Sequence, residues 1–199
     1  MGNVRLYGST SGYTELAAPA VAPDGVLTLP AVAGTLATTA DVAAAGKILQ
    51  VVSVFKADTF TTTSTSLIDV TGLTATITPS ETSSKILVTV SISLQNSTIG
   101  GSSRGALIRG ATQIGGGTGA GSRGSASFRS RVGVSGAGYG PATFVFLDDP
   151  ATTAATTYKV QIATEGGTTG SVGLSNGSDS DNVNFPRLSS TITVMEIGA

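Results

Sequence analysis

Residues 86–94 read ILVTVSISL, and this stretch decides the fold. Its even-numbered positions are all large aliphatic residues, whereas its odd-numbered positions carry Leu87 and then only Thr and Ser. A period of two places alternate side chains on opposite faces of an extended chain. The stretch therefore predicts a β-strand that turns one face toward a core.

Similar short runs, rich in β-branched and aromatic residues, occur on both sides of this stretch. The further strand candidates are 49–56, 67–78, 106–114, 125–134, 142–147, 157–164, 170–174 and 189–197. No helical periodicity follows residue 46. About eight to ten short strands separated by turn signals predict an all-β domain, an antiparallel β-sandwich or jelly roll.

Residues 1–45 differ from this pattern and predict an extended N-terminal arm ahead of a head domain at 46–199. Within the arm, Val26–Leu29 reads as a short strand, and 38–46 has the cap, alanines and closing glycine of a short helix. Such a segment has too few large apolar residues to bury a core of its own. We expect it to lie on the head, on sister chains or on another protein.

The composition excludes several classes of function. The 199 residues include no His, Cys or Trp, only 12% are charged, and the net charge is −1. Without His or Cys, the chain lacks the commonest acid–base group near neutral pH and the commonest transition-metal ligands. No apolar run approaches the roughly 18 residues that cross a bilayer, and no hydrophobic signal segment begins the chain. We expect no enzyme activity, cofactor, metal, nucleic acid or membrane insertion.

Glycine and positive charge gather between residues 99 and 140. No acidic residue lies between Glu81 and Asp148, whereas acidic residues outnumber basic ones from Asp148 onward. The glycine-rich part is interpreted either as long surface loops or as a close-packed apex between subunits, and the charges either form a patch or are interleaved by neighbouring strands. The candidates for receptor or intersubunit contacts in these loops are Arg104, Arg109, Arg123, Phe128, Arg129, Arg131 and Tyr139.

The acidic side chains leave two alternatives open. A carboxylate-based glycosidase needs two carboxylates about 5 to 10 Å apart, and the available clusters are Asp148 with Asp149 and Asp179 with Asp181. The second cluster could also supply oxygen ligands to calcium, but it lacks the spacing of an EF-hand loop. Turns in which these side chains bond their own backbone are the favoured interpretation of both clusters.

The arm resembles a segment of bacteriophage tail fibres and related virion surface proteins, through residues 12–19, 26–30 and 34–41. The strings LTATITPSETSSKILVTVSISL, DDPATTAATTYKVQIATEGG and SSTITVMEI are similar to trimeric, tumour-necrosis-factor-like jelly-roll heads at the ends of viral fibres. The resemblance implies a homotrimer with an N-terminal attachment arm and a distal β head. The residues expected to attach the arm to the particle are Leu6, Tyr7, Tyr13, Leu27, Leu29 and Leu36.

The sequence thus predicts a non-enzymatic virion structural protein at the surface of a capsid or tail. Because the chain has room for one arm and one head, a capsid decoration or cement protein is slightly favoured over a short fibre. The expected partners are two further copies of the chain and the major capsid or tail proteins. The alternative is a tail-fibre adhesin whose loops at 100–140 bind a glycan on the host surface.

Overall fold

A computed structural model describes residues 4–7, 13–16, 46–132, 141–175 and 183–198. The chain divides into two compact units, Met1–Val42 and Ala43–Ala199. In the first unit, β1 (Val4–Tyr7) pairs antiparallel with β2 (Tyr13–Leu16), a hairpin that the sequence analysis did not predict. The predicted strand at 26–29 and all of the predicted helix except Gly46 lie outside the described residues.

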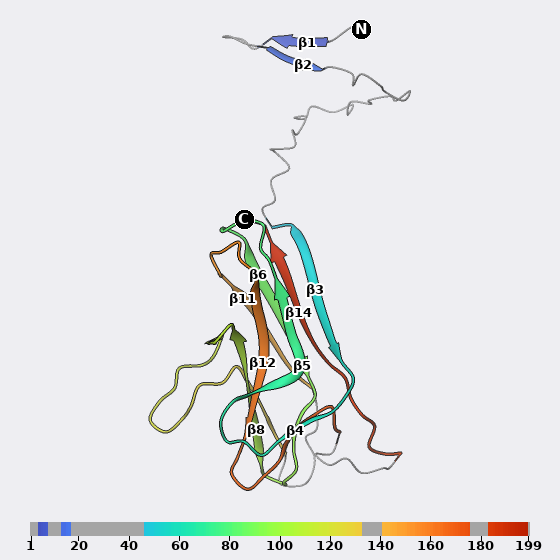
Figure 1. The fold of residues 1–199 in the computed structure, drawn as a ribbon, viewed down its shortest axis with the longest axis vertical. Coiled ribbons are helices and arrows are strands. Elements are labelled where there is room, and N and C mark those ends of the chain that lie inside the picture. The colour runs from blue at the N-terminus through green and yellow to red at the C-terminus, as the bar shows by residue number, and fades with distance from the viewer. Residues whose placement is uncertain (1–3, 8–12, 17–45, 133–140, 176–182, 199) are drawn as a thin grey trace. The chain divides into compact units, whose positions relative to one another are not determined.

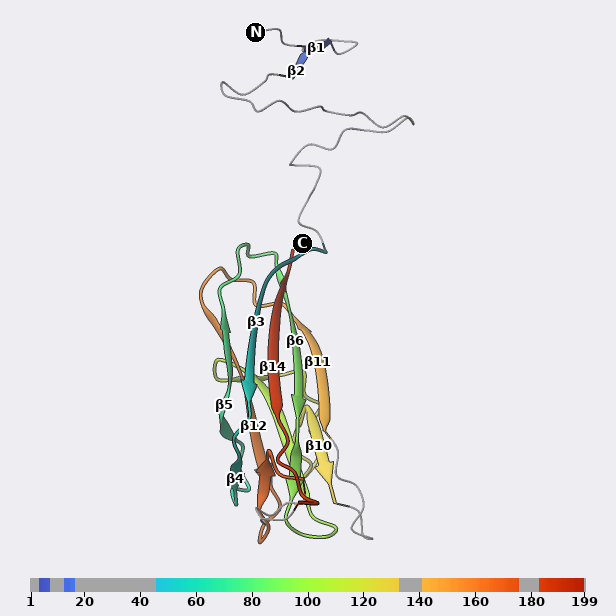
Figure 2. The same ribbon diagram turned by 90° about the vertical axis from the view of Figure 1, so that its right-hand side faces the viewer.

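The second unit is built on two antiparallel sheets (Figures 1 and 2). One has the strand order β11–β6–β14–β3, and the other has the order β10–β8–β12–β5 with β9 paired to β8. The bounds of the first sheet are β11 Ala142–Asp148, β6 Lys85–Ile92, β14 Ser190–Ile197 and β3 Ile48–Lys56. Those of the second are β10 Phe128–Arg131, β8 Ser102–Arg109, β12 Thr156–Thr164, β5 Ile68–Ile77 and β9 Thr112–Ile114.

A small third sheet joins three short strands in the order β4–β13–β7. These strands are β4 Phe60–Thr62, β13 Gly170–Val172 and β7 Leu94–Asn96. Every regular element in the described ranges is therefore a strand, and the all-β prediction is confirmed for that part of the chain. Within the same ranges, no helix is long and apolar enough to cross a membrane.

The core lies between the inward faces of the two large sheets. Along β6, the even-numbered positions are buried and the odd-numbered ones are half-exposed, as the alternation at 86–94 predicts. Ile192 and Val194 of β14 lie on the same side, and Leu107, Tyr158 and Val160 of the facing sheet belong to the same buried cluster. Burying large apolar side chains removes their surface from water and stabilises the sandwich.

Two predicted strands differ in the structure. The run at 106–114 is not one strand, because Gly110 adopts a φ of +60° in the turn between β8 and β9. A positive φ suits glycine, which has no Cβ to clash with the backbone. Within the described part of the run at 125–134, which ends at residue 132, the strand covers Phe128–Arg131. The remaining strand candidates of the head fall close to the observed bounds, and β5 ends shortly before Pro79 as expected.

Candidate functional site

The outward face of the β11–β6–β14–β3 sheet carries no charged side chain over three consecutive rows. Strand register places Leu147, Leu87, Met195 and Val51 in one row across all four strands. We call the twelve residues of the three rows the uncharged face; they are Val51, Ser53, Phe55, Leu87, Thr89, Ser91, Thr143, Val145, Leu147, Thr191, Thr193 and Met195.

The large apolar side chains of the uncharged face are strongly exposed at its two edges. Phe55 is 66% exposed, Leu147 56%, Val145 55% and Val51 53%. Between these side chains, the Ser53 and Thr193 hydroxyl groups form a hydrogen bond of 2.8 Å. Large apolar patches with polar surroundings are typical of surfaces that bind another protein.

The outward face of the other large sheet has the opposite character. Lys159 of β12 lies 2.8 Å from Asp69 of β5, and Arg104 of β8 lies directly opposite Arg129 of β10. Charged side chains are what a solvent-facing antiparallel sheet ordinarily carries. The two outer faces of the sandwich therefore differ: the charged face is typical of a surface in contact with solvent, whereas the uncharged face is typical of a surface that contacts another protein.

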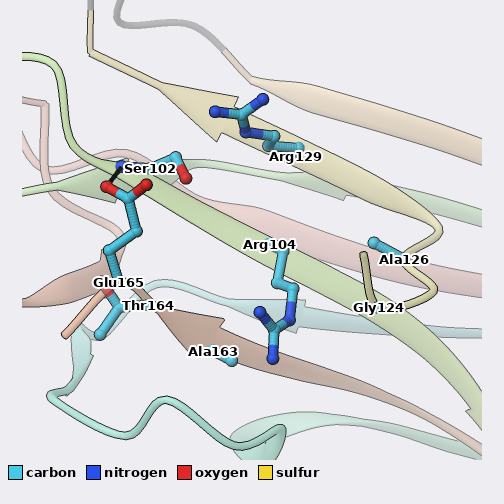
Figure 3. Close-up of a pocket in the computed structure, with 8 residues that line it drawn as sticks. All are labelled: Ser102, Arg104, Gly124, Ala126, Arg129, Ala163, Thr164 and Glu165. Carbon is cyan, nitrogen blue, oxygen red and sulfur yellow. Dashed lines mark hydrogen bonds between the residues drawn. The ribbon is translucent and has the colours of Figure 1, made fainter. Parts of the chain in front are cut away.

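A pocket of about 250 Å³ lies on this charged face, between β8, β10 and the end of β12 (Figure 3). Arg104, Arg129 and Glu165 supply its charges. Glu165 accepts a hydrogen bond from the Ser102 amide at 3.0 Å, and Arg104 donates to the Thr65 carbonyl at 2.9 Å. Arg129 forms no hydrogen bond or ion pair among the described residues. The pocket therefore presents one anchored and one unengaged guanidinium group.

The charges that are segregated along the sequence are partly interleaved in space. Arg109 donates to both carboxylate oxygens of Asp148 at 2.9 Å, and Lys85 pairs with Asp149. The Tyr158 hydroxyl also donates to Asp148, at 2.7 Å. Burial of Tyr158, followed by the nearby Asp148 charge, raises the pKa of this hydroxyl far above its usual range. Arg109 is thus engaged in a structural network at the end of the sandwich.

The receptor or intersubunit candidates do not form one loop cluster. Arg104 and Arg109 are in β8, and Phe128, Arg129 and Arg131 are in β10. Only Arg123 is in a loop, where its backbone pairs with that of Ala120, and Tyr139 lies outside the described residues. Of the five in strands, Arg109, Phe128, Arg129 and Arg131 fall within the predicted strands 106–114 and 125–134, and Arg104 lies in a part of β8 that the sequence did not predict. The part that the seven candidates play in receptor or intersubunit contacts stays a prediction.

Phe128 is half-buried against the core. Its ring centroid lies 6.3 Å from that of Phe144, and its ring covers Gly105 on the neighbouring strand. A ring in this position contributes to packing between the sheets. The half-buried ring does not offer a free face on which a sugar could stack.

The attachment candidates of the arm are described only in part. Leu6 and Tyr7 are in β1 and Tyr13 is in β2, where Tyr7 pairs with Tyr13 across the hairpin. Leu27, Leu29 and Leu36 lie outside the described residues. The role of all six residues stays a prediction.

Both carboxylates of the first acidic cluster have structural partners, because Asp148 forms an ion pair with Arg109 and Asp149 forms one with Lys85. Asp179 and Asp181, the calcium candidates, lie outside the described residues. Elsewhere in the described ranges, no three acidic side chains come together in a way that could hold a metal ion.

Sequence reasoning missed the two surfaces that the structure brings together, although it contained a signal for one of them. The outward positions of residues 87–91 and 191–195 are Leu, Met, Thr and Ser without a charge, which is unusual for a strand face in water. Glu165 gave no comparable signal, because it comes next to Ser102 and Arg104 only through the pairing of β12 with β8.

No protein-family model and no curated protein matches the chain. Among solved structures, it is similar to T=1 particles derived from infectious bursal virus, at a TM-score of 0.33 and 13% identity over 98% of this chain and 44% of that one. For the Gx strain of infectious bursal disease virus the TM-score is 0.32, with 16% identity over 96% and 46% of the two chains. For the VP2 subviral particle of that virus the TM-score is 0.29, with 13% identity over 96% of this chain and 46% of that one.

All three similar structures are viral particles, and this chain spans less than half the length of each of their chains. TM-scores this far below 0.5 do not establish a common fold. What the protein does must therefore be argued from its own residues and surfaces.

Proposed function

We propose that the protein is a non-enzymatic virion structural protein, a capsid decoration or cement protein or a short fibre, that assembles as a homotrimer. Residues 1–45 form its attachment arm and residues 46–199 its head. The uncharged face carries this proposal, because a sheet face that combines exposed large apolar side chains with hydroxyl groups and has no charge is suited to burial in an oligomer. The resemblance of the arm to virion surface proteins supports the location on a capsid or tail.

The strand order supports a jelly roll within this proposal. Numbered from one to eight along the chain, the strands in the main order of the two large sheets are β3, β5, β6, β8, β10, β11, β12 and β14. One sheet then has the order 6-3-8-1 and the other 5-4-7-2. A chain that passes back and forth between two four-stranded sheets in this order is typical of an eight-stranded jelly roll. Such a head would place the uncharged face toward its sister subunits and the charged face toward solvent.

The first prediction tests assembly through the uncharged face. Native mass spectrometry of the full chain is expected to give three times the 19.6 kDa chain mass. The substitution V51K places a charge in the row shared with Leu147 and Met195, where desolvating the ammonium group would cost several kcal/mol. We expect V51K to be a folded monomer.

The matched control is T76K, which adds the same charge to the outward face of β5 in the other sheet. Thr76 is exposed and bonds only the Thr157 hydroxyl at its side chain. T76K is expected to remain a trimer with the circular dichroism spectrum of the wild type. A monomeric wild-type chain at micromolar concentration, or a trimeric V51K, would contradict the proposal.

The second candidate function is a receptor-binding adhesin that contacts a glycan on the host surface. The observation that favours it is the pocket containing Arg104 and Arg129, which opens on the face that the trimer would leave in solvent. Both functions are compatible with the same assembly. They differ in whether the charged face binds a ligand.

A further inference from the structure

We propose that the pocket between β8, β10 and the end of β12 binds one oxyanion, a carboxylate, sulfate or phosphate group, carried by an acidic saccharide. The inference gives a ligand class to the adhesin alternative above and does not depend on trimer formation. Four features of the pocket carry it: two arginines directly opposite each other in the strand register, the lack of a partner for one of them, the position of Glu165, and the kinds of residue in the lining.

Two arginines directly opposite each other in the strand register are costly without an anion. In the register of β10 and β8, Arg129 lies directly opposite Arg104. Side chains directly opposite in an antiparallel pair have Cβ atoms about 5 Å apart, so two like charges there destabilise the sheet. Neither arginine forms an ion pair with a described residue. Figure 3 shows the two guanidinium groups pointing away from each other, so an anion that both bind requires the Arg129 side chain to turn. An anion bound in this way would offset the repulsion and accept hydrogen bonds from both groups.

The two arginines have different roles in this arrangement. Arg104 is held by its hydrogen bond to the Thr65 carbonyl, so its guanidinium group is positioned before any ligand arrives. Arg129 is exposed and unengaged, so it can turn toward the bound group. The planar guanidinium fork matches the oxygen spacing of carboxylate, sulfate and phosphate.

Glu165 limits the ligand to one anionic group. It closes the end of the pocket near Ser102, where its carboxylate accepts the hydrogen bond from the Ser102 amide (Figure 3). Two arginines and one glutamate leave the lining with a formal charge of +1. A second anionic group on the ligand would meet the Glu165 carboxylate, and a polyanion such as nucleic acid would therefore be repelled at this end.

The remaining lining favours a saccharide acid over a neutral sugar. Ser102 contributes a hydroxyl-bearing residue, whereas the buried Thr164 hydroxyl is engaged with Asn96 and Thr168, and Ala126 and Gly124 leave room beside Ser102. No aromatic ring lines the pocket, so a neutral sugar would lack the stacking surface that such ligands ordinarily use. Recognition must then come mainly from the charge of the ligand.

The experiment is isothermal titration of the full chain with glucuronic acid, glucose 6-sulfate and glucose 6-phosphate, against glucose and inorganic sulfate. Binding of at least one sugar acid, with glucose silent and inorganic sulfate weaker, is the expected result. The three acids distinguish which oxyanion is preferred. If inorganic sulfate binds as tightly as every sugar acid, the saccharide assignment is overturned, and if no acid binds better than glucose, the site itself is overturned.

Three variants assign the binding to this pocket. R129Q removes the unengaged guanidinium and is expected to weaken binding by about tenfold, the usual effect of losing a charge-assisted hydrogen bond. R131Q removes the same charge from the same strand outside the pocket lining and is expected to stay within about twofold. E165Q is expected to tighten binding several-fold. Equal losses in R129Q and R131Q, or unchanged binding in R129Q, would contradict the assignment.

Discussion

At the scale of single residues, the clearest result is the buried carboxylate of Glu196. This β14 side chain faces inward, and the residue is 1% exposed. It accepts hydrogen bonds from the Ser80 amide at 2.7 Å, the Ser80 hydroxyl at 2.6 Å and the Gln50 amide nitrogen at 2.7 Å. Burial by itself raises the pKa of Glu196, but these donors outweigh it and hold the pKa at about 2.

The lowered pKa predicts acid-sensitive stability. Because the folded-state pKa of Glu196 lies below the unfolded value of 4.5, its contribution is fully present above that value and is lost as the pH falls toward about 2. E196Q is isosteric but removes the charge, so we expect it to lower the free energy of unfolding at pH 7 by on the order of 3 kcal/mol.

Urea denaturation at pH 7 and at pH 2.5 measures this effect. The difference between wild type and E196Q should shrink strongly at the lower pH, because the Glu196 carboxylate of the unfolded chain is protonated there and folding must remove that proton. The exposed Glu81 is the control, and E81Q should stay within about 0.5 kcal/mol of wild type at both values. A difference for E196Q that does not depend on pH would show that the lost contacts, and not the charge, are responsible.

At the scale of elements, the contact of β8 with β10 depends on a glycine. A Cβ atom added at Gly105 would lie 2.0 Å from the Phe128 ring. This explains one glycine of the segment at 99–140 as a close approach within one chain, an arrangement that neither interpretation of the sequence included. Phe128 could be identified as one of few aromatics there, but only the pairing of Phe128 with Gly105 shows that its ring packs inward.

The substitution G105A is expected to destabilise the head by about 1 to 3 kcal/mol through overpacking against this ring. Thermal or urea unfolding measures the loss, and adding F128L should recover part of it, because the smaller side chain makes room for the methyl group. G117A is the control, since a Cβ at Gly117 would meet nothing within 4 Å. If G105A were as stable as G117A, the packing of β10 on β8 would be different from the one described.

At the scale of the whole molecule, the arm and the head have separate tasks in the proposed function. A chain lacking residues 1–45 is expected to keep the folded head, because Ala43–Ala199 forms its own compact unit. It is expected to lose attachment to the particle. Co-sedimentation with particles measures the loss, and immunogold labelling of the full chain separates a decoration protein, with signal over the capsid, from an adhesin, with signal at the tail tip.

The control for this deletion is the circular dichroism and native mass of the shortened chain, which should match those expected for the head. A truncated head that still decorates particles normally would contradict the attachment role of the arm. A truncated head that is unfolded would instead contradict the division of the chain into two independent parts.

Much of the head was determined by the sequence alone. The alternation in residues 86–94 fixes which side chains of β6 are buried, because a period of two in a strand leaves only one way to place the aliphatic residues inside. The lack of His and Cys likewise follows from the sequence alone, and it removes the commonest acid–base group near neutral pH and the commonest transition-metal ligands. These properties depend on neighbouring residues or on composition, and no long-range contact is needed to state them.

The tertiary structure alone decided which strands are neighbours, and both proposed surfaces follow from that. Val51 and Leu147 share one row only because β14 and β6 lie between their strands. Arg104 and Arg129 lie opposite each other, and Glu165 lines the same pocket, only because β10, β8 and β12 pair in that register. Partners this far apart in the chain are selected by the packing of the two sheets around a common core, which no local sequence pattern encodes.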